Sequence, residues 1–182
     1  TASDRGELAW WDLRTQRKAR ALEIASGYHA LALTPDGLTV AVGIDGGIQL
    51  VDVGTGKVRT ATAGFAGSPS WLRFSPDGTS VVSANLDGTV TRWDAKSARP
   101  LETLRGHSNA VQQLVFSLDG TTLYTVSSDG TAIAWGLTGN RSVKRQFTFT
   151  HDRDFDGAFD RHPGRFSPDG EAVLFTWPGG EL

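Results

Sequence analysis

The sequence lacks several residue types and patterns on which whole classes of function depend. It contains 182 residues, with no cysteine and no methionine among them. Without cysteine these residues form no disulfide, no thiolate nucleophile and no cysteine-ligated zinc site. The apolar runs stay well short of the roughly 18 to 20 residues that a membrane-spanning helix needs, and no charged-then-apolar leader opens the sequence. We therefore expect a soluble domain with a cytoplasmic location.

An excess of charge of either sign is also missing. The sequence has 18 lysines and arginines and 20 aspartates and glutamates, for a formal net charge of −2, and the two signs are interspersed. Binding to nucleic acid or to an anionic membrane usually requires a clustered basic face. We therefore expect neither a nucleic-acid partner nor a membrane partner.

What the sequence has instead is a repeat. A five-residue motif that ends in Asp-Gly occurs four times, and its closing glycines are 41, 42 and 50 residues apart: Leu33–Gly37, Phe74–Gly78, Phe116–Gly120 and Phe166–Gly170. A second Asp-Gly pair follows the first three copies, at Asp45, Asp87 and Asp129. Short β-prone runs broken by Asp-Gly predict antiparallel strands joined by tight turns, because these residues accept positive φ angles.

A third recurring position has the same period as the two Asp-Gly motifs and identifies the kind of repeat. The residue that closes the following strand is Trp11, Val51, Trp93 and then Trp135, at spacings of 40, 42 and 42. With Gly106-His107 ahead of the best copy, this period and these signatures resemble WD-repeat β-propellers. The resemblance implies an all-β fold of four-stranded antiparallel blades, with three full blades and a split half-blade at each end.

We place the whole sequence, residues 1–182, in one such domain. The expected units are a half-blade at 1–24, blades at about 29–63, 70–104 and 110–149, and a half-blade at 165–182. The two half-blades add up to one blade, and a ring of four would be small for this family. Since the chain also begins with Thr1 rather than methionine, we expect half of a larger ring, completed by further sequence or by a second copy; a self-closed four-bladed ring is the alternative.

One group of residues invites a catalytic interpretation. His107, Asp129 and a hydroxyl from Ser127 or Thr125 could form a Ser-His-Asp triad. The resemblance implies instead a buried structural tetrad of His107, Ser127 or Thr125, Asp129 and Trp135. We assign His107, Ser127, Asp129 and Trp135 to this tetrad and predict no catalytic residues.

The other blades depart from the tetrad pattern. Phe65 replaces the histidine of blade three, and Val51 replaces the tryptophan of blade two. We therefore expect apolar packing to hold these blades together. Trp71 and Trp177 are expected to be core or inter-blade residues.

An insertion precedes the last copy of the motif, between Phe149 and Phe166. Alternate carboxylates in a tight loop can converge on one hard cation, and four aspartates have this spacing: Asp152, Asp154, Asp156 and Asp160. They are a candidate calcium site, in which the ion would order the loop; no cofactor is otherwise required. The alternative is a plain polar loop in which these carboxylates pair with Arg153 and Arg161.

The same insertion carries candidate partner-binding residues. Phe155 and Phe159 are apolar residues within a charged segment, as interface anchors are, although Phe159 could instead fold back onto its own loop. In the family's geometry the insertion lies on the rim that bears the Asp-Gly turns, where partners usually dock.

We predict a non-catalytic protein-interaction scaffold or sensory docking module that binds protein partners or a second copy of itself. The alternatives are a calcium-binding propeller and the propeller part of a larger signalling enzyme. A central-channel active site would need acidic residues or histidines at the start of each innermost strand, and those positions hold Leu31, Trp71 and Gln112.

Overall fold

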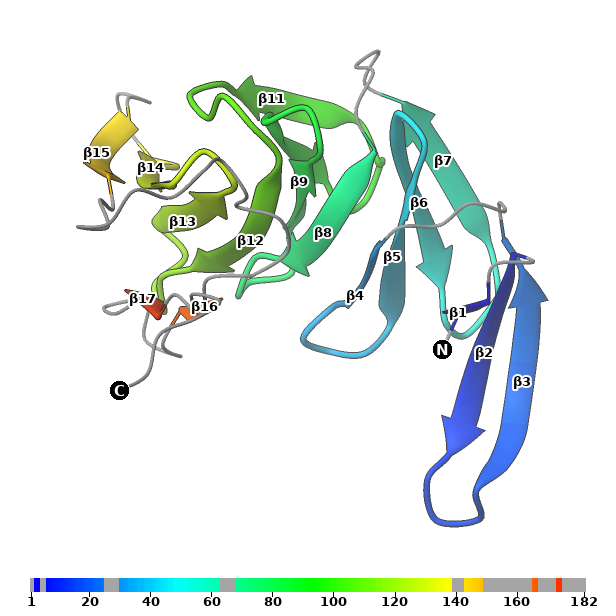
Figure 1. Cartoon of the computed structure of the whole chain (residues 1–182). Helices are drawn as coiled ribbons and strands as arrows, with labels where there is room; N and C mark the ends of the chain where they lie inside the picture. Colours follow the sequence, from blue (N-terminus) through cyan, green and yellow to red (C-terminus); the bar gives the residue numbers. More distant parts are fainter. Residues whose placement is uncertain are drawn as a thin grey trace, which may run out of the picture.

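The computed structural model describes residues 2–3, 6–24, 30–62, 68–138, 143–148, 165–166 and 173–174. In these ranges every helix or strand element is a β-strand, as predicted for an all-β chain. The strands form five antiparallel sheets, each built from consecutive segments of the chain (Figure 1). Within the same ranges, no helix has the length and apolar character needed to cross a membrane.

Three of the sheets are complete four-stranded blades. Blade two contains β4 (Ala30–Leu33), β5 (Thr39–Ile44), β6 (Gly47–Asp52) and β7 (Val58–Thr62). Blade three contains β8 (Pro69–Phe74), β9 (Ser80–Asn85), β10 (Val90–Asp94) and β11 (Pro100–Leu104). Blade four contains β12 (Val111–Phe116), β13 (Thr122–Ser127), β14 (Thr131–Gly136) and β15 (Val143–Thr148). The prediction of three full four-stranded blades is confirmed.

A smaller sheet lies at each end of the array. The N-terminal sheet contains β1 (Ala2–Ser3), β2 (Glu7–Asp12) and β3 (Arg17–Glu23), and the C-terminal one pairs β16 (Arg165–Phe166) with β17 (Val173–Leu174). The N-terminal sheet differs from the two-strand prediction by the short strand β1, which pairs with Glu7 and Leu8.

The repeated five-residue motif forms a tight turn that links the first two strands of each blade. In blade three the Ser75 hydroxyl donates to Asp77 at 2.6 Å, and the Thr79 N–H donates to the same carboxylate at 3.0 Å. The turn closes at Gly78, whose φ of 70° lies in the left-handed region that glycine favours. Thr34 with Asp36 and Ser117 with Asp119 repeat this geometry in the neighbouring blades. The five-residue motif therefore recurs in the sequence because each copy forms the same hydrogen-bonded turn.

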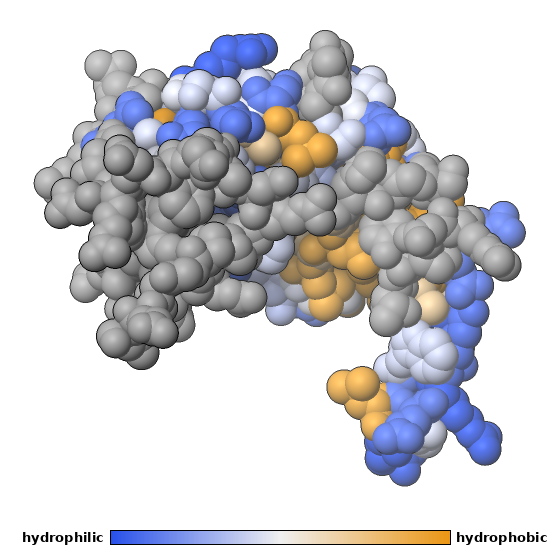
Figure 2. All heavy atoms as spheres, viewed as in Figure 1, coloured by the Kyte–Doolittle hydropathy of each residue, from blue (hydrophilic) through white to orange (hydrophobic). Residues whose placement is uncertain are grey.

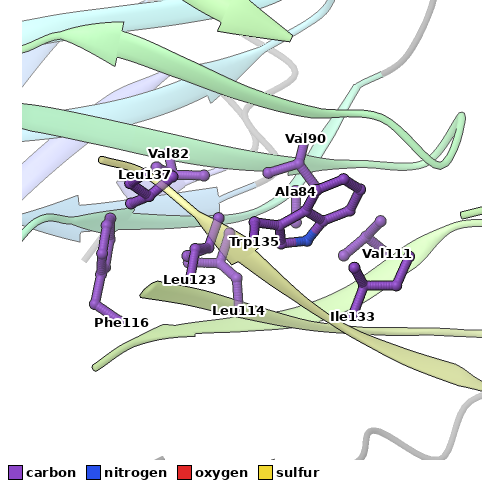
Figure 3. Close-up of a cluster of buried hydrophobic side chains, with 10 residues drawn as sticks. All are labelled: Val82, Ala84, Val90, Val111, Leu114, Phe116, Leu123, Ile133, Trp135 and Leu137. Carbon is purple, nitrogen blue, oxygen red and sulfur yellow. The ribbon is translucent and has the colours of Figure 1, made fainter. Parts of the chain in front are cut away.

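Neighbouring blades pack through their apolar faces. Between blades three and four, three buried residues of blade three meet seven of the following segment (Figure 3): Val82, Ala84, Val90, Val111, Leu114, Phe116, Leu123, Ile133, Trp135 and Leu137. A second cluster joins blades two and three, with Leu50 and Trp93 both fully buried. Burial of this kind is the main stabilising contribution in a repeat array, since each unit packs only against its neighbours.

The described sheets follow one another along an open arc, from β1–β3 at one end to β12–β15 at the other (Figure 1). The first strands of the three blades lie on the inner side, where β4 contacts β8 and β8 contacts β12. The N-terminal sheet is attached to blade two by Arg20, which donates to the carbonyls of Val53 at 2.6 Å and Gly54 at 3.0 Å. This arrangement gathers the three innermost strands into one continuous concave surface.

Candidate functional site

Four side chains of blade four form a hydrogen-bonded chain across the blade. The Trp135 indole N–H donates to the Thr125 hydroxyl at 2.8 Å. Thr125 Oγ1 lies 2.7 Å from His107 Nε2, and His107 Nδ1 lies 3.1 Å from Asp129 Oδ2. With the imidazole proton on Nδ1, His107 donates to Asp129 and accepts from Thr125, so that each link has one donor and one acceptor.

The hydroxyl in this chain belongs to Thr125, which corrects the assignment of Ser127 to the tetrad. The two residues lie on the same face of β13, two positions apart, so their spacing from His107 does not separate them. Ser127 makes different hydrogen bonds, because its hydroxyl donates to the Asn109 carbonyl at 2.9 Å and its oxygen accepts from the Asp129 N–H at 3.1 Å. It braces the loop that enters β12.

A fifth member, Thr131, was missed from the sequence. Its hydroxyl donates to Asp129 Oδ1 at 2.6 Å and lies 3.0 Å from His107 Nδ1. The signal for it was present, because a threonine also follows the Asp-Gly pair of blade three, where the Thr89 hydroxyl donates to Asp87 at 2.6 Å. A threonine directly after Asp-Gly fixes the aspartate in place for its other contacts.

Burial decides the charge state of this network. The His107 side chain is fully buried, and burial lowers its pKa below the ordinary value of 6.5, although the charge and hydrogen bond of Asp129 oppose the shift. For Asp129, burial raises the pKa, but hydrogen bonds from Thr131 and from the Ser108 backbone outweigh it, so the net pKa is lowered. Near neutral pH a neutral imidazole therefore faces an ionised carboxylate.

The sequence of groups in this chain, a hydroxyl, a histidine and a carboxylate, resembles a hydrolytic triad. Their buried position, however, indicates a structural role. Thr125 is fully buried, and its oxygen already accepts the Trp135 N–H and faces His107. A nucleophile must be able to reach a substrate carbonyl beside an oxyanion hole. His107, Thr125 and Asp129 therefore act together as an internal brace that satisfies buried polar groups.

Among the described residues, the equivalent hydrogen-bonded chain has fewer members in blade three than in blade four, and none in blade two. In blade three the Trp93 N–H donates to the Ser83 hydroxyl at 3.0 Å, while the expected histidine position, Phe65, lies outside the described residues. In blade two the corresponding positions hold Val51 and Ala41, both fully buried. Apolar packing thus replaces the polar chain in blade two, as the sequence indicated.

The concave surface formed by the innermost strands contains a groove of about 550 Å³. It crosses all three blades at the end of β4, β8 and β12 that leads into the five-residue turns. Its lining is mainly apolar: Leu31, Ala32, Leu33, Pro35, Trp71, Leu72, Arg73, Phe74, Pro76, Val115, Phe116, Ser117 and Leu118. Figure 2 shows apolar side chains gathered on this side of the molecule.

Several of the lining side chains face solvent. The exposed fractions are 37% for Leu31, 56% for Leu33, 40% for Trp71 and 79% for Leu118. Alternation along the strands explains the pattern, since Ala32 and Leu72 turn toward the blade interiors while their neighbours face outward. Trp71 therefore differs from the expected core or inter-blade residue, because much of its indole is exposed.

The residues predicted for partner or ion binding in the insertion are not among those described. This applies to Asp152, Asp154, Asp156 and Asp160, and equally to Phe155 and Phe159. Trp177, expected to be a core or inter-blade residue, also lies outside the described residues. Across the described ranges, no group of three or more histidine or acidic side chains is arranged to hold a metal ion. The calcium site remains a prediction from sequence alone.

Comparison with protein families identifies two repeats of a known kind in the chain. Residues 60–94 and 98–136 match the family "WD domain, G-beta repeat". Each match begins near or in the outer strand of one blade and ends in the third strand of the next, so the sequence repeat is offset from the structural one. WD40 repeats generally mediate protein–protein interaction or scaffolding and are typically non-catalytic. Comparison with curated proteins gives no significant match. The two matched segments and the three four-stranded blades support the assignment of the chain to the WD-repeat family.

Proposed function

We propose that this chain is a non-catalytic protein-interaction module that docks a partner polypeptide in the groove on its innermost strands. The observation that carries the proposal is the solvent exposure of Leu33, Trp71 and Leu118 within one groove. Fully burying a large apolar side chain contributes about 1.5 to 3 kcal/mol. A partner that covered these side chains would therefore gain affinity from the surface as it stands.

The supporting blades make the groove a rigid one. The side chains directly behind it, such as Leu72 and Phe74, are buried in the clusters that join neighbouring blades. A surface held by a packed core loses little conformational freedom when a partner binds, so less of the interaction energy is spent on ordering. We expect docking without rearrangement of β4, β8 or β12.

The groove lies at the opposite end of the innermost strands from the rim predicted for docking. On β12 the predicted rim is at Val111, next to Ser128 and Asp129, whereas the groove begins at Val115 and continues to Leu118. A partner on the groove would therefore leave free the second set of Asp-Gly turns, at Asp45, Asp87 and Asp129. The two ends are separate surfaces for binding.

Selection from a random peptide library displayed on phage tests the proposal. We expect the immobilised chain to enrich peptides whose binding weakens at least about tenfold in Leu33→Glu, because the substitution removes an apolar contact and places a charge under the bound segment. The matched control is Leu101→Glu on the outer strand β11, where the leucine is similarly exposed.

The library experiment separates the groove from the rest of the surface. Peptides that bind wild type and Leu101→Glu equally well but lose Leu33→Glu support the proposal. Failure to enrich any peptide, or equal binding to both glutamate variants, contradicts it. Thermal melts of both variants establish that each one is folded before binding is compared.

A further inference from the structure

We propose that the groove is specific for a polypeptide segment that carries a single carboxylate among apolar residues, with the carboxylate bound by Arg73. This inference rests on the proposed docking function and adds the chemistry of the partner. It is drawn from the one charged side chain in an otherwise uncharged lining.

Arg73 is the arginine that lines the groove. It lies on β8 between Leu72 and Phe74, with its side chain on the exposed face of the strand. Arg20 donates to the Val53 and Gly54 carbonyls, and the guanidinium of Arg92 lies 3.0 Å from Glu102 Oε1. The Arg73 guanidinium makes no hydrogen bond or ion pair to any described residue, so no described acceptor occupies its donors.

The groove lining has few other polar side chains. The Ser117 hydroxyl donates to Asp119 at 2.6 Å, which leaves the Trp71 indole N–H as the remaining side-chain donor of the lining besides Arg73. A guanidinium provides five donors and no acceptor, in a fork that matches a carboxylate. Complementarity of charge and geometry therefore favours a carboxylate at Arg73, with apolar neighbours on Leu31 and Trp71.

The rim restricts how acidic the segment can be. Asp36, Asp77 and Asp119 directly follow the lining residues Pro35, Pro76 and Leu118 in the three turns. Hydrogen bonds from Thr34, Ser75 and Ser117 respectively lower the pKa of each carboxyl, so all three are ionised at neutral pH. A run of acidic residues or a phosphate would be repelled by this rim, whereas one carboxylate can reach Arg73.

The openness of the groove favours a polypeptide over a small carboxylate such as a fatty acid. Pockets for small molecules usually enclose most of the ligand surface. Here Leu33 and Leu118 are more than half exposed, and the lining residues come from the innermost strands of three blades. A chain that crosses all three strands can cover these side chains together.

Fluorescence polarisation with defined peptides tests the inference. The probes are labelled nine-residue peptides of alternating leucine and serine with a central glutamate, glutamine, lysine or phosphoserine. We expect the glutamate peptide to bind the full chain at least about tenfold more tightly than the others. Arg73→Leu should abolish the preference, Arg73→Glu should transfer it to the lysine peptide, and Arg99→Leu, which removes an exposed arginine between β10 and β11, should leave it unchanged.

The outcomes distinguish this inference from the docking function. Equal binding of all four peptides, sensitive to Leu33→Glu, overturns the carboxylate preference and leaves the docking groove intact. A preference for lysine or phosphoserine overturns it as well. Dodecanoate that competes as strongly as the glutamate peptide would identify a small-molecule site and overturn the choice of a polypeptide. Absence of binding by every peptide contradicts the inference, while the library selection decides the docking function independently.

Discussion

Blades two and four have the same strand pairing, but their equivalent interior positions hold different chemistry. In blade four, Trp135 and Thr125 join His107 and Asp129 in a hydrogen-bonded chain. In blade two the positions of Trp135 and Thr125 hold Val51 and Ala41, both fully buried. The polar network is thus not required to build a blade. Apolar packing against the neighbouring blades is enough.

In both blades the aspartate of the second Asp-Gly turn is hydrogen-bonded to a loop that enters a blade. In blade four, Asp129 accepts from the Ser108 N–H at 2.8 Å and from His107, so it fixes the loop that enters its own blade. In blade two, Asp45 accepts from the Ser68 hydroxyl at 2.6 Å, in the loop that enters blade three. Gly88 adds to this bracing, because a Cβ there would lie 2.8 Å from the His107 carbonyl. The network therefore orders loops and adds to the larger stability that the apolar cores supply.

The largest effect is expected from the apolar core of blade two. Leu50→Ala should lower the free energy of unfolding by about 2 to 5 kcal/mol, because the side chain is fully buried and its removal leaves a cavity. Urea unfolding followed by circular dichroism measures this. The control is Leu101→Ala on the exposed outer strand, expected to cost about 0.5 kcal/mol or less. Equal losses in the two variants would contradict a packing-held blade.

A smaller effect is expected when the polar network of blade four is broken. His107→Ala should cost about 1 to 3 kcal/mol, since it removes the acceptor that faces the buried Thr125 hydroxyl and one donor to Asp129. Ser68→Ala, which removes the more exposed hydrogen bond to Asp45, should cost less. An unchanged melting curve for His107→Ala would mean that the network does not form in solution.

The dependence on pH distinguishes the network from the apolar cores. Because burial lowers the pKa of His107 below 6.5, the unfolded chain binds more protons than the folded one as pH falls below 6.5. The stability contributed by neutral His107 is therefore present above pH 6.5 and lost below it, down to the lower pKa of the folded state. His107→Gln should flatten the unfolding profile between pH 7 and 5 relative to wild type. The other three histidines are common to both proteins, and parallel profiles would contradict the assignment.

The smallest effect is expected from the insertion. If Asp152, Asp154, Asp156 and Asp160 bind calcium, the melting temperature should rise with calcium concentration and return with excess chelator, because a ligand specific for the folded state stabilises it by mass action. The double variant Asp154→Asn, Asp156→Asn removes two of the proposed ligands and should abolish the shift. A melting temperature that is insensitive to calcium would return the insertion to a plain polar loop.

The strand order was predictable because the turn chemistry repeats. Asp77 and Asp119 each fix a turn through a hydroxyl two residues earlier, and Asp-Gly places the next turn. The five-residue motif, the second Asp-Gly pair and the strand-closing position recur with the same period, and together they predict three full blades. The short strand β1 had no such motif, and the sequence did not predict it.

The details of the sites were less accessible from sequence. Thr125 and Ser127 share one face of β13, so only the positions of atoms separate a tetrad hydroxyl from a loop brace. The sequence did not predict the groove, because Leu31 and Trp71 are large apolar residues of the kind usually found in a core. The arrangement of β4, β8 and β12 shows that their side chains face outward. The solvent exposure of these side chains depends on how the three blades are arranged, and the sequence of a single repeat does not specify that arrangement.

Site-specific photo-crosslinking tests the central claim, that the groove on the innermost strands is the docking surface. Benzoylphenylalanine would replace Trp71 in the groove or, as the comparison, Leu101 on the outer strand of the same blade. Irradiation with a library-selected peptide should give an adduct at position 71 and none at position 101. Adducts at position 101 alone, or at both positions equally, would contradict docking in the groove.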